Sequence, residues 1–170
     1  MSQKEIAHGD LLYHAVHGLC RVDDVTTENQ SGREVLRYSL VPKTANRMKV
    51  RFDVSNTDLQ ASGFHAPVSM KEAREILEYL RAGDPAAATD EDQAWVLART
   101  VLSSSQDAPE FKDARKRQAL ERSARGLVGE LALVLKMTLS DAAASVQKSL
   151  GNPAKTSPTV LAALALAGKD

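Results

Sequence analysis

Three histidines and the only cysteine lie close together near the start of the chain. His8, His14, His17 and Cys20 are separated by six, three and three residues. Nitrogen and sulfur ligands in a set of four can bind zinc in a tetrahedral site. His8 lies in the N-terminal tail, however, and the other three would have to converge from two strands. Structural roles are therefore the favoured interpretation, and neither a metal nor another cofactor is expected.

A second group of charged side chains is basic. Between residues 110 and 125, six cations face three carboxylates. Phosphate groups of DNA would suit such a patch, because each neutralised phosphate releases a counterion. The alternative is the solvated face of an amphipathic helix, with Glu121 and Arg125 one turn apart. The cations are Lys112, Arg115, Lys116, Arg117, Arg122 and Arg125.

Neither an enzyme nor a strongly charged binding protein is indicated. The sequence has no phosphate loop and no paired acidic motif, and the serines at 103–105 lack a partner base, so no catalysis and no small-molecule substrate are expected. Twenty-two basic and 22 acidic residues cancel, so nucleic acid could bind only at a local patch. No apolar signal core or run of about 20 apolar residues occurs. We expect a cytoplasmic protein that does not cross a membrane.

The segment before Pro67 reads as short strands separated by turns, one of them a hairpin turn predicted at residues 29–32. In residues 47–54 the apolar side chains occupy the even positions and the charged side chains the odd positions. A strand with this period of two would place Arg47, Lys49 and Arg51 in solvent. Four or five antiparallel strands of this size are expected to curl into a partly closed barrel that buries one face.

The segment after Pro67 reads as helices. Ser69 to Glu72 matches a capping box, and Gly83 is expected to end this first helix. Thr89 or Asp90 is expected to begin a second helix, and Pro109 fits the first turn of a long third helix. The predicted buried stripe of the third helix consists of Leu120, Ala124, Leu127, Val128, Leu131 and Leu135.

The last part of the chain predicts a short fourth helix and a tail. Ser140 is expected to begin the helix and Gly151 to end it. Thr159 to Ala167 is apolar enough for one more small helix, docked on this chain or on a partner. The expected fold is therefore α+β: a small antiparallel β-barrel in residues 1–66, about four helices in residues 67–151, and a tail in residues 152–170.

Two stretches of the sequence together resemble one family. Residues 9–22 read GDLLYHAVHGLCRV, and the second stretch, residues 120–133, ends in GLVGELAL. The first resembles the signature of the CarD/CdnL transcription regulators, a module that also occurs in transcription-repair coupling factor. The second resembles one of that family's C-terminal core helices. The two stretches have the family's order, and the strand pattern and the helical part between them also agree with it. The resemblance therefore covers most of residues 9–150.

This resemblance implies a Tudor-like β unit that binds a lobe of the RNA polymerase β subunit, in part by aligning a strand edge with it. Arg51 matches a strand arginine that the family uses against polymerase, and Arg47 and Lys49 share its predicted face. A second family arginine corresponds to Glu28, which reverses the charge. The resemblance also implies a helical domain that touches promoter DNA at the upstream edge of the transcription bubble, without catalysis.

The helical part departs from the family pattern. It is too short for one of the family's helices before GLVGELAL. The family inserts a tryptophan, followed by basic residues, into the minor groove, as apolar wedges do. Trp95 lies at about the right distance, but Val96, Leu97 and Ala98 follow it. A packing role in the core is therefore favoured for Trp95 over a wedge or another interface anchor.

Together these features predict a bacterial transcription regulator that binds the RNA polymerase β subunit and tunes initiation. Promoter DNA contact is left open. The residues expected to bind polymerase are Arg51, Lys49 and Arg47, and those considered for DNA are Arg117, Lys116, Arg115 and Trp95. The alternative is an adaptor of the same family that lacks DNA binding and recruits another protein through its helical domain and the tail.

Overall fold

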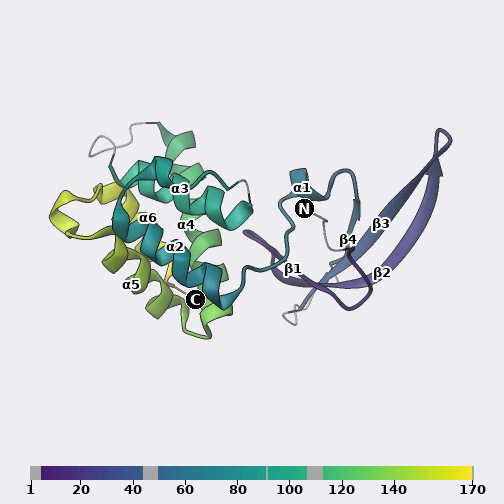
Figure 1. Ribbon diagram of the computed structural model, residues 1–170, viewed down its shortest axis with the longest axis horizontal. Coiled ribbons are helices and arrows are strands. Elements are labelled where there is room, and N and C mark those ends of the chain that lie inside the picture. Colours follow the sequence, from purple (N-terminus) through teal and green to yellow (C-terminus); the bar gives the residue numbers. More distant parts are fainter. Residues whose placement is uncertain (1–4, 44–49, 91, 107–112, 170) are drawn as a thin grey trace. The chain divides into compact units, whose positions relative to one another are not determined.

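The chain consists of an antiparallel β unit followed by a helical unit. The computed structural model describes residues 5–43, 50–90, 92–106 and 113–169, apart from the side chain of Gln60 (Figure 1). The residues divide into two compact units, Met1–Pro67 and Val68–Asp170. The first contains the strands and the second contains helices, so the layout is α+β.

The β unit is an open four-stranded sheet. Its strands are β1 (Leu11–His14), β2 (Gly18–Gln30), β3 (Arg33–Pro42) and β4 (Phe52–Ser55), paired antiparallel in that order. In the described residues β1 and β4 do not pair with each other, so the expected closure into a barrel is not observed. Both outer strands are only four residues long. A loop covers the apolar face of the sheet, where the predicted barrel would have covered it by pairing its outer strands.

That loop follows α1 (Leu59–Ser62) and carries Phe64, which is 5% exposed. Phe64 packs in a cluster with buried side chains from three strands. The backbone of His65 exchanges two hydrogen bonds with the backbone of Tyr13 in β1, at 2.6 and 3.0 Å. The loop therefore binds the outer edge of β1 and closes the core. The buried strand residues are Leu12, Cys20, Val22, Tyr38 and Leu40.

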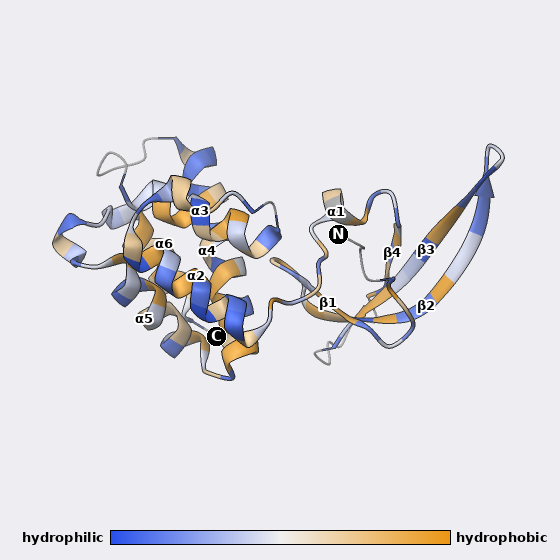
Figure 2. Ribbon diagram, in the orientation of Figure 1, coloured by the Kyte–Doolittle hydropathy of each residue, from blue (hydrophilic) through white to orange (hydrophobic). Residues whose placement is uncertain are grey.

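Strands β2 and β3 form the long hairpin of the sheet. Ser31 and Gly32 connect them, both with positive φ, the combination found in tight two-residue hairpin turns. This agrees with the turn predicted at residues 29–32. Figure 2 shows hydrophilic residues at the far end of this hairpin. Asp23 is an extra residue in β2, because the pairing passes from Val22 to Asp24 without it. Such a β-bulge redirects side chains.

Strand β4 is shorter than the predicted strand over residues 47–54. It begins at Phe52, and the predicted contact residues Arg47 and Lys49 lie outside the described residues. The predicted alternation holds from Arg51 onward. Arg51 and Asp53 are exposed, whereas Phe52 and Val54 are partly buried against the core of the sheet.

The helical unit contains α2 (Met70–Ala82), α3 (Gln93–Ser105), α4 (Ala114–Leu135), α5 (Leu139–Leu150) and α6 (Pro158–Ala167), with short 3₁₀ turns at Pro85–Ala87 and Pro153–Lys155. The predicted ends of α2 are confirmed. The Ser69 hydroxyl accepts a hydrogen bond from the Glu72 amide at 3.1 Å, and Gly83 adopts the left-handed conformation with φ 76°.

Three predicted helix starts are wrong or lie outside the described residues. Helix α3 begins after Asp92, not after Thr89 or Asp90, and α5 begins after Thr138, not after Ser140. The Thr138 hydroxyl accepts from the Asp141 amide at 3.1 Å, which leaves Ser140 inside the first turn. Helix α4 begins after Asp113, and Pro109 is not among the described residues. Neighbouring polar residues offered several possible caps, and only the local backbone selected among them.

The five helices share one apolar core, and α6 is part of it. Buried side chains of α6 join the cluster formed by α2 to α5, and α6 packs against α4 and α5. The apolar tail helix is therefore docked on its own chain. The predicted stripe of α4 is confirmed except at Leu135, which is only partly buried. The buried residues of α6 are Val160, Ala163, Leu164 and Ala167.

Glu130 is a fully buried carboxylate within this helical core. One of its oxygens accepts a hydrogen bond from the Val68 amide at 3.2 Å. This contact attaches the segment that enters α2 to the middle of α4. None of the helices in the described part of the chain has the length and apolar content needed to cross a bilayer.

Candidate interaction surfaces

Arg51 lies on the solvent face of the sheet, immediately before the outer strand β4. Its side chain is 56% exposed, and its Nη2 donates to Oδ2 of Asp23 at 2.9 Å. Arg21 donates to the other oxygen of the same carboxylate at 3.4 Å, and its side chain is 57% exposed. We call these three residues the Arg–Asp–Arg bridge. It joins residues of β2 to a residue 28 positions later in the chain.

The register of the sheet explains how this bridge forms. Arg21 pairs with Val41, and the last pair between β3 and β4 is Leu40 with Phe52. If this register is continued by one residue, Arg51 lies opposite Val41. Arg21, Val41 and Arg51 are therefore neighbours in one row across the sheet. Asp23 lies two residues after Arg21 in β2, on the same strand face and at the unpaired bulge position, and its carboxylate contacts both guanidinium groups.

The motif around His14 shapes a turn. His14 Nδ1 accepts hydrogen bonds from the amides of Val16 and His17 at 3.0 and 3.3 Å. Its Nε2 lies 2.9 Å from the Ser62 carbonyl oxygen and donates to it, which fixes the neutral tautomer with the proton on Nε2. Burial, with smaller contributions from nearby His17 and His65, lowers the pKa of His14 despite the bond to Ser62.

The same motif has no metal geometry in the structure. In the described part of the chain, no three His, Cys, Asp or Glu side chains come close enough together to hold an ion. Cys20 is fully buried, and burial raises the pKa of its thiol. The ring of His17 packs against that of Phe52, with centroids 4.3 Å apart and an angle of 36° between the ring planes. These side chains pack the end of the sheet.

The predicted basic triplet lies in the first turn of α4. Arg115, Lys116 and Arg117 are all exposed. Consecutive residues on a helix are rotated by about 100°, so these three cations point in different directions. Arg122 follows Arg115 by seven residues and shares its face. The exposed cations therefore do not form a single patch at the triplet.

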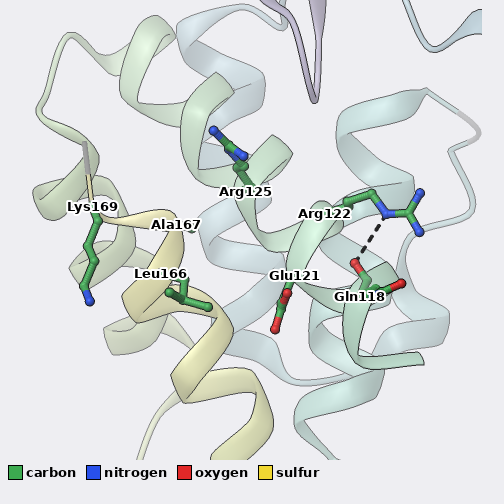
Figure 3. Close-up of a pocket in the computed structure, with 7 residues that line it drawn as sticks. All are labelled: Gln118, Glu121, Arg122, Arg125, Leu166, Ala167 and Lys169. Atoms are coloured by element: carbon green, nitrogen blue, oxygen red, sulfur yellow. Dashed lines mark hydrogen bonds between the residues drawn. The ribbon is translucent and has the colours of Figure 1, made fainter. Parts of the chain in front are cut away.

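A hollow of about 490 Å³ lies where the middle of α4 meets the end of α6. Figure 3 shows its lining residues, with Arg122 and Arg125 extending in different directions and Glu121 between them. Arg122 Nε donates to the carbonyl oxygen of Gln118 at 3.4 Å. The cations of this hollow do not converge on one point. The lining residues are Gln118, Glu121, Arg122, Arg125, Leu166, Ala167 and Lys169.

Trp95 is a core residue, which agrees with the favoured packing role, and its burial does not support a contact with DNA. It is 9% exposed and lies edge to face with Tyr79, with ring centroids 5.7 Å apart. The Tyr79 hydroxyl donates to the Pro85 carbonyl at 2.9 Å and anchors the pair. The helical period of α3 places Trp95 on the same side as Ala98 and Val101. A wedge has to present its ring to the base stack, and this ring is covered.

Two residues of the Arg–Asp–Arg bridge were missed by the sequence interpretation. Arg21 and Asp23 occupy the outward positions of a strand in which buried and exposed residues alternate, and this pattern alone does not mark either of them as a contact residue. A signal does exist: the inward-facing positions are Cys20 and Val22 before the bulge and Val25 after it. This change from even to odd positions is what one inserted strand residue produces.

Comparisons of the chain with protein-family models and with curated proteins gave no match.

Proposed function

We propose that this protein is a cytoplasmic bacterial transcription regulator that binds a lobe of the RNA polymerase β subunit through its β unit and modulates initiation. The resemblance of residues 9–22 to the CarD/CdnL signature motivates the proposal. The observation that carries it is the position of Arg51, which is 56% exposed beside the outer strand of the sheet. We also propose that the β unit, with its open sheet, is related to the Tudor fold.

The edge of β4 suits the proposed mode of binding. An extended segment of a partner can add to an outer strand through main-chain hydrogen bonds, while side chains near the edge supply specificity. Arg51 directly precedes Phe52, the first residue of β4. A partner strand paired along β4 would therefore pass the guanidinium group. The turn held by His14 reaches β4, because the ring of His17 lies against that of Phe52 with centroids 4.3 Å apart.

Binding of the full chain to the isolated polymerase lobe tests the proposal. Isothermal titration calorimetry should give a saturable association, and Arg51→Glu should weaken it by about 30-fold or more, because the reversed charge also repels the partner. Arg33→Glu is the matched control, since Arg33 is exposed at the far end of the hairpin in the same sheet. Absence of binding by the wild-type protein would refute the proposal.

The protein-interaction adaptor without DNA contact remains a second candidate function. Burial of Trp95 favours it, because the wedge expected for promoter contact is not exposed. Exposed cations on α4 favour the DNA-binding form of the regulator. Fluorescence anisotropy with promoter DNA at increasing salt separates the two candidates. Measurable binding at low salt that weakens steeply with salt supports DNA contact, and no binding at low salt supports the adaptor.

A further inference from the structure

We infer that the helical unit associates with a second copy of this chain through one face, formed by α6 and the middle of α4. The inference goes beyond the proposed function, because it concerns the helical unit and its test needs no polymerase. It assigns an occupant to the hollow between the two helices. The residues that carry the contact are Leu166 on α6 and Glu121 and Arg125 on α4.

Helix α6 has an apolar side that its own chain does not cover. From Val160 to Ala167 every residue is Ala, Val or Leu. One side of the helix packs against α4 and α5, whereas Ala162, Ala165 and Leu166 are exposed, Leu166 by 53%. These three residues share the other side of the helix. A helix that is apolar on all sides belongs in a protein interior, so this side lacks a cover.

The hollow lies directly beside this apolar side. Leu166 and Ala167 form its α6 wall, and Figure 3 shows Leu166 between Lys169 and the side chains of α4. All its lining residues except Ala167 are exposed, so it is an open groove and not an enclosed cavity for a small ligand. A groove of this kind receives an apolar side chain that a protein partner presents on its surface.

The charges beside the groove are self-complementary. Glu121 and Arg125 lie one turn apart on α4, yet no ion pair joins them in the described part of the chain. Arg122, by contrast, donates through Nε to the Gln118 carbonyl oxygen at 3.4 Å. In a dimer with a twofold axis, the same face meets itself. Glu121 of one copy then faces Arg125 of the partner subunit, and each Leu166 enters the groove of the other copy.

Other occupants suit the groove less well. The phosphates of DNA would meet the carboxylate of Glu121 and the exposed apolar side chain of Leu166, and neither stabilises a phosphate. A strongly acidic protein would meet the same carboxylate. The chain itself has 22 basic and 22 acidic residues, so net charge does not keep two copies apart. A second copy offers both an apolar side chain and charges of both signs.

Sedimentation equilibrium of the full chain tests the inference. Wild type should pass from monomer to dimer between about 10 µM and about 1 mM, as expected for a small interface. Leu166→Glu should weaken the dimer by about 30-fold or more, because it brings like charges together where the two copies meet. Leu133→Glu is the matched control, since Leu133 is also exposed but lies outside the groove. A wild-type chain that stays monomeric, or a dimer unaffected by Leu166→Glu, would overturn the inference.

Two charge reversals test the contact between the copies. Glu121→Arg and Arg125→Glu should each weaken self-association by about tenfold, because like charges then face each other. An equimolar mixture of the two variants should form a heterodimer about as tight as the wild-type dimer, since a carboxylate again faces a guanidinium group at both contacts. Each variant keeps like charges one turn apart in its own chain, so effects within the chain cannot explain this recovery. Failure of the mixture to associate would overturn the self-complementary arrangement.

Methyl NMR of the full chain identifies what covers the face. On dilution the signals of Leu166 should shift, while those of Leu133 should not. A short DNA duplex should leave the Leu166 signals of the dimer unchanged. If the chain is monomeric and the duplex shifts Leu166, DNA covers this face and the inference is overturned, whereas polymerase binding by the β unit is unaffected. Circular dichroism melting curves verify that every variant is folded.

Discussion

The two arginine-rich regions of this protein are built in opposite ways. On the sheet, Arg21 and Arg51 are distant in sequence and meet at one carboxylate. On α4, Arg115 and Arg117 are close in sequence but diverge around the helix. A local excess of charge in a sequence therefore need not converge in space, whereas strand register can bring charged residues together from distant parts of the chain. The following experiments challenge or sharpen this contrast, beginning with the largest effect.

Trp95→Ala should have the largest effect, and on stability. Removing this buried ring should lower the free energy of unfolding of the helical unit by about 3 to 5 kcal/mol, because a large cavity remains beside Tyr79. Urea unfolding followed by circular dichroism at 222 nm measures the loss. Trp95→Phe, which keeps an aromatic ring, is the control and should cost less. Unchanged stability together with lost DNA binding would contradict the core role and restore Trp95 as a wedge that contacts DNA.

Two triple variants should separate the sequence cluster from the helix face. If α4 binds DNA, replacing Arg115, Arg122 and Arg125 with alanine should reduce affinity at low salt by about tenfold or more. Their backbone positions, at i, i+7 and i+10, lie along one side of the helix, so the variant removes phosphate contacts spaced along that side. Replacing Arg115, Lys116 and Arg117 should have a smaller effect, because these residues diverge. Anisotropy titrations over a range of salt concentrations give both slopes. A larger effect of the second triplet would show that the sequence cluster itself is the contact.

Acid should destabilise the β unit through His14. The pKa of His14 is lowered in the folded chain, so the unfolded chain binds more protons as the pH falls below about 6.5. Stability from the neutral ring is therefore present at higher pH and is lost on acidification. Amide hydrogen exchange of Leu12 and Cys20, measured at pH 7.5 and pH 5.5, should report faster opening at the lower pH.

His14→Asn is the control for this pH effect. The asparagine side chain can accept from the Val16 amide but does not titrate, so the difference between the two pH values should shrink. An equal response to acid in the variant would exclude His14 as the cause. Protection of α4 amides should not depend on this substitution.

Glu28→Gln should have the smallest effect. The contact between Glu28 and Arg37 is long, at 3.8 Å, and partly exposed, so its loss should cost less than about 0.5 kcal/mol. Thermal melting measures stability, and calorimetry with the polymerase lobe measures binding. An increase in lobe affinity similar in size to the loss in Arg51→Glu would show that the interface extends along the hairpin to Glu28 and is not confined to the surroundings of Arg51.

Much of the local structure was predictable because it depends on neighbouring residues. The Ser69 cap, the Gly83 end of α2, the hairpin turn and the buried stripe of α4 all follow from patterns within a few residues. The starts of α3 and α5 were misplaced, because several polar residues near each start can cap a helix. The sequence also could not predict whether the sheet stays open or closes into a barrel. That outcome depends on whether Phe64 or another strand covers the apolar face.

The amino-acid sequence by itself determined the α+β order, the position of the exposed Arg51 and the apolar character of the last helix. Tertiary structure decided that α6 completes the core of its own chain, that Trp95 is covered, and that Asp23 joins Arg21 to Arg51. The physical reason is the range of the interactions. Propensity and periodicity act over one or two turns, whereas burial and ion pairing depend on which distant segments the fold brings together.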